Sequence, residues 1–339
     1  MSPIAATLLT LPRLGNAYLS KSAYEILAAT MSDRTTSSDE TPAPAILKAI
    51  LASPPSSSDT TLAPSWLVLL GSIMAAYSES SPEECATELP SVWSTSYGFL
   101  ESDVLAVRDG AQEALVALST CITADQIAAT VKANDKGKDI GKLPLGKIIQ
   151  QVAKSLESLA FAKATPQILV VLSALTLALR TLPNSIPGVD KTPAEALLLP
   201  LITQVGNLRV KPKFLYKEGA DALLDTAMRV MGAHVLLSTL PLNIEPSDRE
   251  AGREPRAFIL ALLPHPHPSP LKHFVDYFVP LSERMFDYQQ KADVAGNSAE
   301  AKMWNVLVLQ VWSGLAGYAW NPTSLPEVRL SFSHRALSS

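Results

Sequence analysis

ESDVLAVRDGAQEALVAL, residues 101–118, is the stretch of sequence that decides the fold. Its apolar side chains recur every three or four residues and therefore lie along one face of a helix. They are Val104, Val107, Ala111, Ala114, Leu115 and Leu118. Gly110 lies inside this pattern and costs the helix about 1 kcal/mol relative to alanine. We therefore expect another helix to approach closely at Gly110, so that this helix packs on more than one side.

Segments with the same helical periodicity follow one another along the chain, whereas strand signals are scarce. Prolines lie at or near many of the expected helix starts, where the missing N–H has no cost. The expected helices cover residues 15–31, 43–52, 64–77, 82–100, 102–120, 145–161, 166–182, 193–208, 214–239, 255–263, 271–290 and 299–318. The polar stretches 32–44, 53–64 and 133–144 are expected to be loops.

About twelve helices with short connections could form a bundle or a stack of antiparallel helix pairs. Successive pairs recur at roughly 40 residues, which is the period of HEAT and armadillo repeats. We therefore predict an all-α fold, a right-handed HEAT/armadillo-like α-solenoid. The repeats are expected to fill residues 1–240 and to continue through 241–326, and the tail 327–339 is expected to be frayed.

The composition is that of a folded chain without a dominant charge. Of the 339 residues, 47% are hydrophobic and 18% are charged, which leaves ample apolar surface to bury. The net charge of −4 excludes general attraction to nucleic acid or anionic membranes, so such contacts require a local basic patch. The apolar segment 168–179 is shorter than the roughly 20 residues of a membrane span and predicts a core helix. Cys85 and Cys121 are isolated in the sequence and are expected to be small buried side chains in a reducing compartment.

Two short patterns resemble chemical sites but are incomplete. Residues 141–148, GKLPLGKI, match a phosphate-binding loop until Ile148, where serine or threonine is needed to bind magnesium. His265, His267 and His273 invite a metal interpretation, but no cysteine or carboxylate pair stands at ligand spacing beside them. We therefore predict no catalytic residues, no metal, no cofactor and no small-molecule substrate, and we do not expect an enzyme.

Basic residues form two clusters on expected inter-helix loops. The first contains Lys132, Lys136, Lys138, Lys142 and Lys147, and the second contains Arg209, Lys211, Lys213 and Lys217. In a stack of repeats such loops can align along one edge and contact RNA phosphates. We expect no base stacking from either loop. The alternative interpretation is that both clusters are solvated loops whose charge keeps the chain soluble.

The stretch 101–118 resembles the second helix of a HEAT repeat. Asp103 stands at the helix start, and Val107-Arg108 precedes Ala111 and two leucines. In HEAT repeats, the aspartate and the arginine at these positions form a ladder between neighbouring repeats. The resemblance implies this ladder role for Asp103 and Arg108.

From residue 241 onward the chain resembles the ribosomal RNA-processing protein twelve family of HEAT-repeat proteins. The resemblance is carried by the segments Pro241-Leu-Asn-Ile244, Arg253, 256–264, 274–283, Ala301-Lys-Met-Trp304, Gln310-Val-Trp312 and Gly317-Tyr318. The start Leu11-Pro12-Arg-Leu14 and the helices after it are similar more loosely, so the resemblance spans most of residues 1–326. Most of these residues lie on apolar helix faces and are expected to pack repeat against repeat. The family likeness implies that the chain is part of a longer solenoid.

The resemblance also implies a function. Members of this family are nuclear and nucleolar scaffolds that bind RNA and accompany pre-ribosomal particles, chiefly the small subunit, through maturation and export. The implied partners are rRNA and pre-ribosomal proteins, with nuclear transport factors as further candidates and no membrane. Shuttling to the cytoplasm would accompany export. The alternative is a HEAT-repeat adaptor or transport-receptor-like scaffold that binds only protein.

Overall fold

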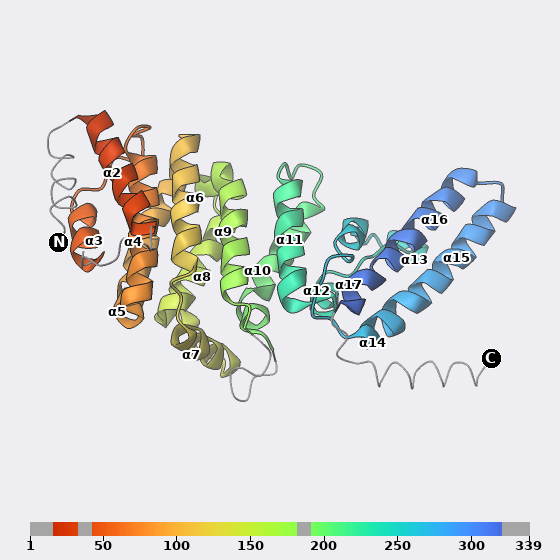
Figure 1. The fold of residues 1–339 in the computed structure, drawn as a ribbon. Coiled ribbons are helices and arrows are strands. Elements are labelled where there is room, and N and C mark those ends of the chain that lie inside the picture. The colour runs from red at the N-terminus through yellow and green to blue at the C-terminus, as the bar shows by residue number, and fades with distance from the viewer. Residues whose placement is uncertain (1–15, 33–42, 182–190, 321–339) are drawn as a thin grey trace. The chain divides into compact units, whose positions relative to one another are not determined.

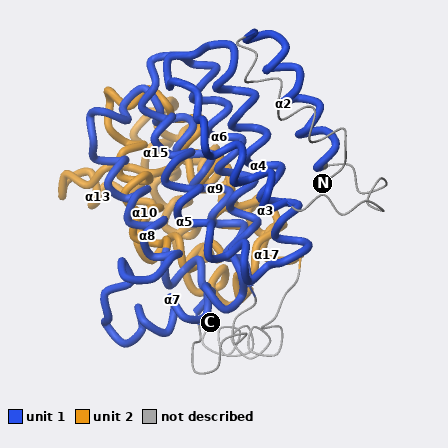
Figure 2. The backbone as a smooth tube through the Cα atoms, turned by 90° about the vertical axis from the view of Figure 1, so that its left-hand side faces the viewer, with its two compact units in different colours: residues 1–197 blue, residues 198–339 orange. Residues whose placement is uncertain are grey.

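The structure, a computed structural model, describes residues 16–32, 43–181 and 191–320. The described residues contain helices and connecting turns, with no strand among them. They form two compact units, Met1–Leu197 and Leu198–Ser339 (Figure 2). The division falls inside one helix, so residues 198–240 belong to the same unit as the segment that carries most of the family resemblance.

The first unit is a two-layered stack of helices (Figure 1). Its α-helices are α2 (Ala17–Ser32), α3 (Ala43–Leu51), α4 (Ala63–Ser80), α5 (Pro82–Gly98), α6 (Leu105–Ser119), α7 (Ala124–Asp135), α8 (Pro144–Glu157) and α9 (Thr165–Ala178). Short 3-10 helices η3 (Phe99–Glu101), η4 (Ile140–Lys142) and η5 (Leu159–Ala164) connect them. Helices α2, α4, α6 and α9 pack side by side in one layer, and α5 packs on α8 in the other. This arrangement confirms the predicted all-α, HEAT-like solenoid.

Helices α4 and α6 make the closest contact in this stack. A Cβ atom on Gly110 of α6 would lie 2.9 Å from the Cα atom of Pro64 in α4, and Gly71 of α4 faces Ala114 of α6 in the same way. The glycines allow the two backbones to approach, and Trp66 and Leu115 are completely buried beside them. The close approach predicted at Gly110 is confirmed.

Helix α9 is one of the most apolar helices of the first unit. Together with η5 it forms a segment, Leu159–Ala178, that is long and apolar enough to cross a membrane by length and composition. Its side chains Ile168, Val171, Leu172 and Leu175 are buried, and the helix packs on α6 and α8. The prediction of a core helix at 168–179 is confirmed by this burial.

The second unit begins within α10 (Pro193–Arg209) and ends in a helical hairpin. Its further helices are α11 (Lys217–Met231), α12 (Ala233–Thr239), α13 (Pro246–Glu250), the 3-10 helix η6 (Ala257–Ala261), α14 (Leu271–His273), the π-helical turn η7 (Phe274–Phe278), α15 (Val279–Val294), α16 (Ser298–Ser313) and α17 (Leu315–Ala319). Helices α15 and α16 pack against each other along the hairpin. Trp304 of α16 is buried against Tyr288 of α15, with ring centroids 4.9 Å apart.

The structure adds a helix that the periodicity did not predict. Helix α7 begins after Thr123, whose hydroxyl accepts from the backbone N–H of Gln126, while the Gln126 side chain accepts from the N–H of Thr123. The expected loop at 133–144 is therefore wrong at both ends, because α7 continues to Asp135 and η4 covers Ile140–Lys142. The reciprocal cap was the missed sequence signal.

Other predicted helices are broken or reshaped. The helix expected at 214–239 is two helices, because Gly232 takes a φ of +95° and the Ser269 hydroxyl accepts from the N–H of Ala233. The helix expected at 145–161 ends at Glu157, and that at 255–263 is the 3-10 helix η6. The helix at 271–290 contains the π turn η7 directly before Pro280, whose ring cannot fit against the carbonyl four residues earlier in a regular helix. Residues 1–15 and 327–339 lie outside the described residues.

Candidate nucleic-acid interface

The first basic cluster surrounds the turn between α7 and α8. Lys132 lies in the last turn of α7, Lys136 and Lys138 follow that helix, Lys142 ends η4 and Lys147 lies in the first turns of α8; all five are exposed. Within the described residues, none of them forms an ion pair. Asp135 and Asp139 are exposed in the same segment, so five lysines face two carboxylates. The segment is therefore a locally positive surface on an acidic chain.

This turn has a defined shape. Helix α7 and η4 both pack on α8, and the Asp139 carboxylate accepts from the N–H of Gly141 at 2.9 Å. Gly146 lies inside α8 in contact with the carbonyl of Ile140, and no side chain would fit there. The second glycine of the phosphate-loop-like pattern therefore has a packing explanation.

In the second basic cluster, Arg209 is already engaged. Its guanidinium donates to both oxygens of Asp221, with N–O distances of 2.7 and 3.0 Å. The same group lies over the ring of Phe258, 4.4 Å from its centroid. The Arg209 side chain is only 17% exposed. Arg209 therefore connects α10 to α11 and to η6, and little of it is available to a ligand.

The other residues of the second cluster are exposed. Lys211, Lys213 and Lys217 face solvent, and no described residue forms an ion pair with them. Phe214 and Tyr216 lie between the lysines, with ring centroids 6.0 Å apart and planes at 86°. Both rings are partly exposed. The expectation of no base stacking rests on neither loop having aromatic residues among its basic ones; that reason is wrong for this loop, and the absence of base stacking itself stays a prediction.

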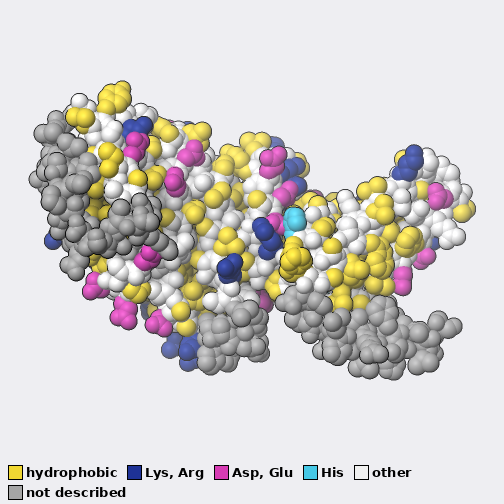
Figure 3. Space-filling view, viewed as in Figure 1, with side chains coloured by type: hydrophobic (Ala, Val, Ile, Leu, Met, Phe, Trp, Pro, Cys, Tyr) yellow, Lys and Arg dark blue, Asp and Glu magenta, His cyan; other side chains and the backbone are white. Residues whose placement is uncertain are grey.

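The two basic clusters belong to different units, 1–197 and 198–339. The expected alignment of their loops along one edge therefore stays a prediction. On the face drawn in Figure 3, lysine and arginine side chains of the described residues are interspersed with acidic ones. A binding surface on this chain must accordingly be local, as the net charge indicates.

Asp103 and Arg108 have different environments. Arg108 is buried and donates from Nη1 to the carbonyl of Ser102 at 2.8 Å. Asp103 is exposed, and its carboxylate accepts from Lys163 of η5 at 2.6 Å. The hydrogen bond and the charge of Lys163 hold the pKa of Asp103 below its ordinary value. Asp103 thus connects the start of α6 to the segment that leads into α9, and the ladder between repeats stays a prediction.

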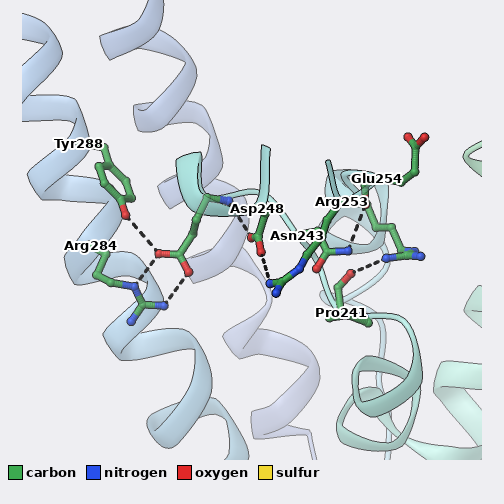
Figure 4. Close-up of polar contacts among 9 residues, drawn as sticks. Pro241, Asn243, Asp248, Arg253, Glu254, Arg284 and Tyr288 are labelled. Carbon is green, nitrogen blue, oxygen red and sulfur yellow. Dashed lines mark hydrogen bonds and ion pairs between the residues drawn. The ribbon is translucent and has the colours of Figure 1, made fainter. Parts of the chain in front are cut away.

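A polar network holds residues 241–256 to α15 (Figure 4). The Glu245 carboxylate accepts from Arg284 at 2.6 and 3.0 Å and from the hydroxyl of Tyr288 at 3.5 Å. Asp248 accepts from the N–H of Glu245 and from Arg253. Glu245 and Arg284 lie 39 residues apart, so no local pattern could have predicted the pair. These charges satisfy one another and hold the segment in place.

The three histidines singled out in the sequence, His265, His267 and His273, have different environments. His265 contacts Asp225 at the surface, whereas His267 is buried, and burial lowers the pKa of its imidazole to about 4. Burial also lowers the pKa of His273 to about 4, and its Nδ1 lies 2.7 Å from the hydroxyl of Tyr318. Across the part of the chain that the structure describes, no group of three or more His, Cys, Asp or Glu side chains is placed to hold a metal ion.

The two cysteines are buried, as expected, but they are not isolated in space. The thiol of Cys85 in α5 donates to the carbonyl of Met74 at 3.6 Å, and the thiol of Cys121, two residues after α6, donates to the carbonyl of Ala117 at 3.7 Å. The neighbouring Cys121 thiol and burial raise the pKa of Cys85 above its ordinary value. The interpretation of the cysteines as buried apolar side chains is confirmed, and the structure adds that they pack together.

Stacked helix pairs with exposed inter-helix loops define an α-solenoid of the HEAT class. The family described as "Ribosomal RNA-processing protein 12, HEAT repeats" matches residues 101–334, which is more than half of the chain. The chain belongs to this family.

Known relatives agree with the family match. Ribosomal RNA-processing protein 12 of Saccharomyces cerevisiae is 25% identical over 342 residues, which cover 96% of this chain and 26% of that protein. The RRP12-like protein of Gallus gallus is 33% identical over 122 residues, 36% of this chain and 9% of the relative. A Schizosaccharomyces pombe relative is 26% identical over 263 residues, 77% of this chain and 20% of its own length. The chain therefore spans about a quarter or less of the relatives it matches.

Proposed function

We propose that this chain is a non-enzymatic HEAT-repeat scaffold in ribosome biogenesis that binds RNA and protein on pre-ribosomal particles. The observation that carries the proposal is the match of residues 101–334 to the HEAT repeats of ribosomal RNA-processing protein 12. The names of the relatives refer to ribosomal RNA processing. The corresponding location is the nucleus and nucleolus, with maturation and export of chiefly the small subunit as the process and nuclear transport factors as further partners.

The exposed lysines support an RNA-binding role. In the first unit these are Lys132, Lys136, Lys138, Lys142 and Lys147, and in the second they are Lys211 and Lys213. Lysine side chains without ion-pair partners among the described residues are free to replace the counterions of a phosphate backbone. Arg209 is a weaker candidate for a phosphate contact, because it forms an ion pair with Asp221.

A salt titration of RNA binding tests the proposal. The logarithm of the affinity for single-stranded RNA should fall linearly with the logarithm of salt concentration, by about 0.7 for each phosphate contact. The triple variant K136Q/K138Q/K142Q should weaken binding and reduce this slope. The matched control changes three exposed lysines outside both clusters, Lys48, Lys154 and Lys302, and should leave the slope nearly unchanged.

The alternative function is a HEAT-repeat adaptor that binds only protein. Absence of RNA binding by the unaltered chain at low salt would support that alternative and remove the RNA-binding role. Equal effects of the two triple variants would instead show that binding is a diffuse response to net charge, without a local interface.

A further inference from the structure

We propose that the segment 210–217, VKPKFLYK, is a site for single-stranded RNA in which Phe214 and Tyr216 stack on bases while the neighbouring lysines contact phosphates. The proposal rests on the proposed function, since it requires that the chain binds RNA. It adds to the proposed function that the bound RNA is single-stranded and that the rings of Phe214 and Tyr216 favour it over duplex RNA. The segment connects α10 to α11 in the second unit (Figure 1).

The charge of this segment has a single sign. No aspartate or glutamate occurs between Glu195 and Glu218, whereas this interval contains Arg209, Lys211, Lys213 and Lys217. Asp221 neutralises Arg209, and no described residue pairs with the three lysines. The first basic cluster, by contrast, includes two exposed aspartates. The segment therefore presents three uncompensated positive charges within seven residues, which suits a phosphate backbone.

The aromatic rings give this surface a preference among nucleic acids. Phe214 and Tyr216 meet edge to face at 86°, so their ring faces point in different directions, and both side chains are partly exposed. Leu215 between them is 83% exposed and adds apolar surface to the tip. Bases in a duplex are stacked on one another and offer no free face, whereas single-stranded bases can stack on aromatic side chains. Lysines alone would bind both forms.

The backbone of the segment is shaped before any ligand arrives. The N–H of Lys211 donates to the carbonyl of Leu208 at 3.0 Å, and the N–H of Phe214 donates to that of Lys211 at 3.1 Å. At the N-terminal end of the segment, Arg209 is fixed by both oxygens of Asp221. At the other end, the carbonyl of Tyr216 accepts from Ala220 in the first turn of α11. A surface ordered in advance loses less conformational entropy on binding, which favours affinity.

Binding of single-stranded and duplex RNA of equal length, measured by fluorescence anisotropy on the full chain, tests the proposal. The variant F214L/Y216L keeps apolar volume but removes both rings. We expect it to weaken single-stranded binding by roughly 5- to 150-fold for each stacked base that is lost, with duplex binding changed less than about twofold. Y216F retains the ring and should bind as the unaltered chain does. F286L, which removes a half-exposed ring elsewhere in the second unit, is the matched control and should have no effect.

The remaining outcomes separate this inference from the proposed function. If the unaltered chain binds RNA but F214L/Y216L weakens single-stranded and duplex binding to the same extent, or weakens neither, the stacking site is overturned and the RNA-binding scaffold stands. If the unaltered chain binds neither form at low salt, both proposals are overturned. Binding of polyglutamate that is equally sensitive to F214L/Y216L would replace RNA by an acidic polypeptide as the ligand. If the double variant does not fold, single-stranded RNA binding by Y216L is compared with that by Y216F instead. Equal affinity of these two single variants overturns the site.

Discussion

Replacing Gly110 by alanine should destabilise the first unit although it improves the helix. Alanine is favoured over glycine inside a helix by about 1 kcal/mol. The new Cβ atom would lie 2.9 Å from the Cα and 3.1 Å from the carbonyl oxygen of Pro64. Both are backbone atoms of the α4 N-terminus and cannot rotate away, so α4 and α6 must separate. Overpacking of this kind costs about 1–3 kcal/mol, so we expect a net loss of about 1 kcal/mol.

Gly98 provides a matched control in the same unit. It is the exposed last residue of α5, it has helical backbone angles, and a Cβ atom there meets nothing within 4 Å. Gly98→Ala should therefore stabilise the chain by up to about 1 kcal/mol, since only the gain in helix propensity remains. The two variants carry the same chemical change, and their free energies of unfolding should differ by about 2 kcal/mol.

Urea unfolding measures this difference. Far-UV circular dichroism follows the helices, and tryptophan fluorescence, to which the completely buried Trp66 of α4 contributes, follows the packing of the side chains. The midpoint should decrease for Gly110→Ala and increase for Gly98→Ala, without a change in the slope of the transition. A Gly110→Ala protein at least as stable as the Gly98→Ala protein would show that α4 and α6 do not approach as closely as argued.

Three further predictions concern buried groups. The pKa of His267 is about 4 in the folded chain and near 6.5 when unfolded, so its contribution to stability is complete above pH 6.5 and decreases as pH falls toward 4; His267 should account for a loss of about 2 kcal/mol at pH 5, His273 should add a similar loss because its pKa is also about 4, and H267F should remove about half of this pH dependence of the urea midpoint. Gly232→Ala should lower the free energy of unfolding by about 1–3 kcal/mol, because its φ of +95° suits only glycine and the added Cβ would lie 2.8 Å from the His234 ring. Arg108→Met should lower the thermal midpoint more than Asp103→Asn, because Arg108 is buried and bonded to a backbone carbonyl whereas the Asp103–Lys163 pair is exposed.

The fold class follows from features that a single sequence displays. The apolar face of α6, with Val107, Ala111 and Leu115 completely buried, is readable because side chains three and four residues apart share a helix face. Pro82 and Pro166 lie in the first turns of α5 and α9, where the sequence placed helix starts. Apolar periodicity and prolines at helix starts are local properties of the sequence, so they can be recognised without knowing which helices pack together.

What could not be predicted depends on residues that meet only in the folded chain. The break at Gly232 uses the hydroxyl of Ser269, 37 positions along the chain, as the cap of α12. Helix α7 was missed because its sequence is nearly neutral in hydropathy and its capping box, Thr123 with Gln126, was the only strong signal. The candidate site could not be fully predicted for the same reason. The sequence shows that Arg209 is basic, but it does not show that the guanidinium pairs with Asp221 and lies over the ring of Phe258.

The environment of Arg209 links the family-like segment to the proposed RNA site. Phe258 belongs to the family-like segment 256–264, and its ring lies under the Arg209 guanidinium. In the same segment Arg256 donates to the side chain of Asn207, two residues before Arg209, at 2.8 Å. Both contacts hold the end of α10, from which the lysine segment extends. Phe258 and Arg256 of the family-like segment can thus act on RNA binding without touching RNA, because they hold the end of α10 from which the exposed lysines and rings of 210–217 extend.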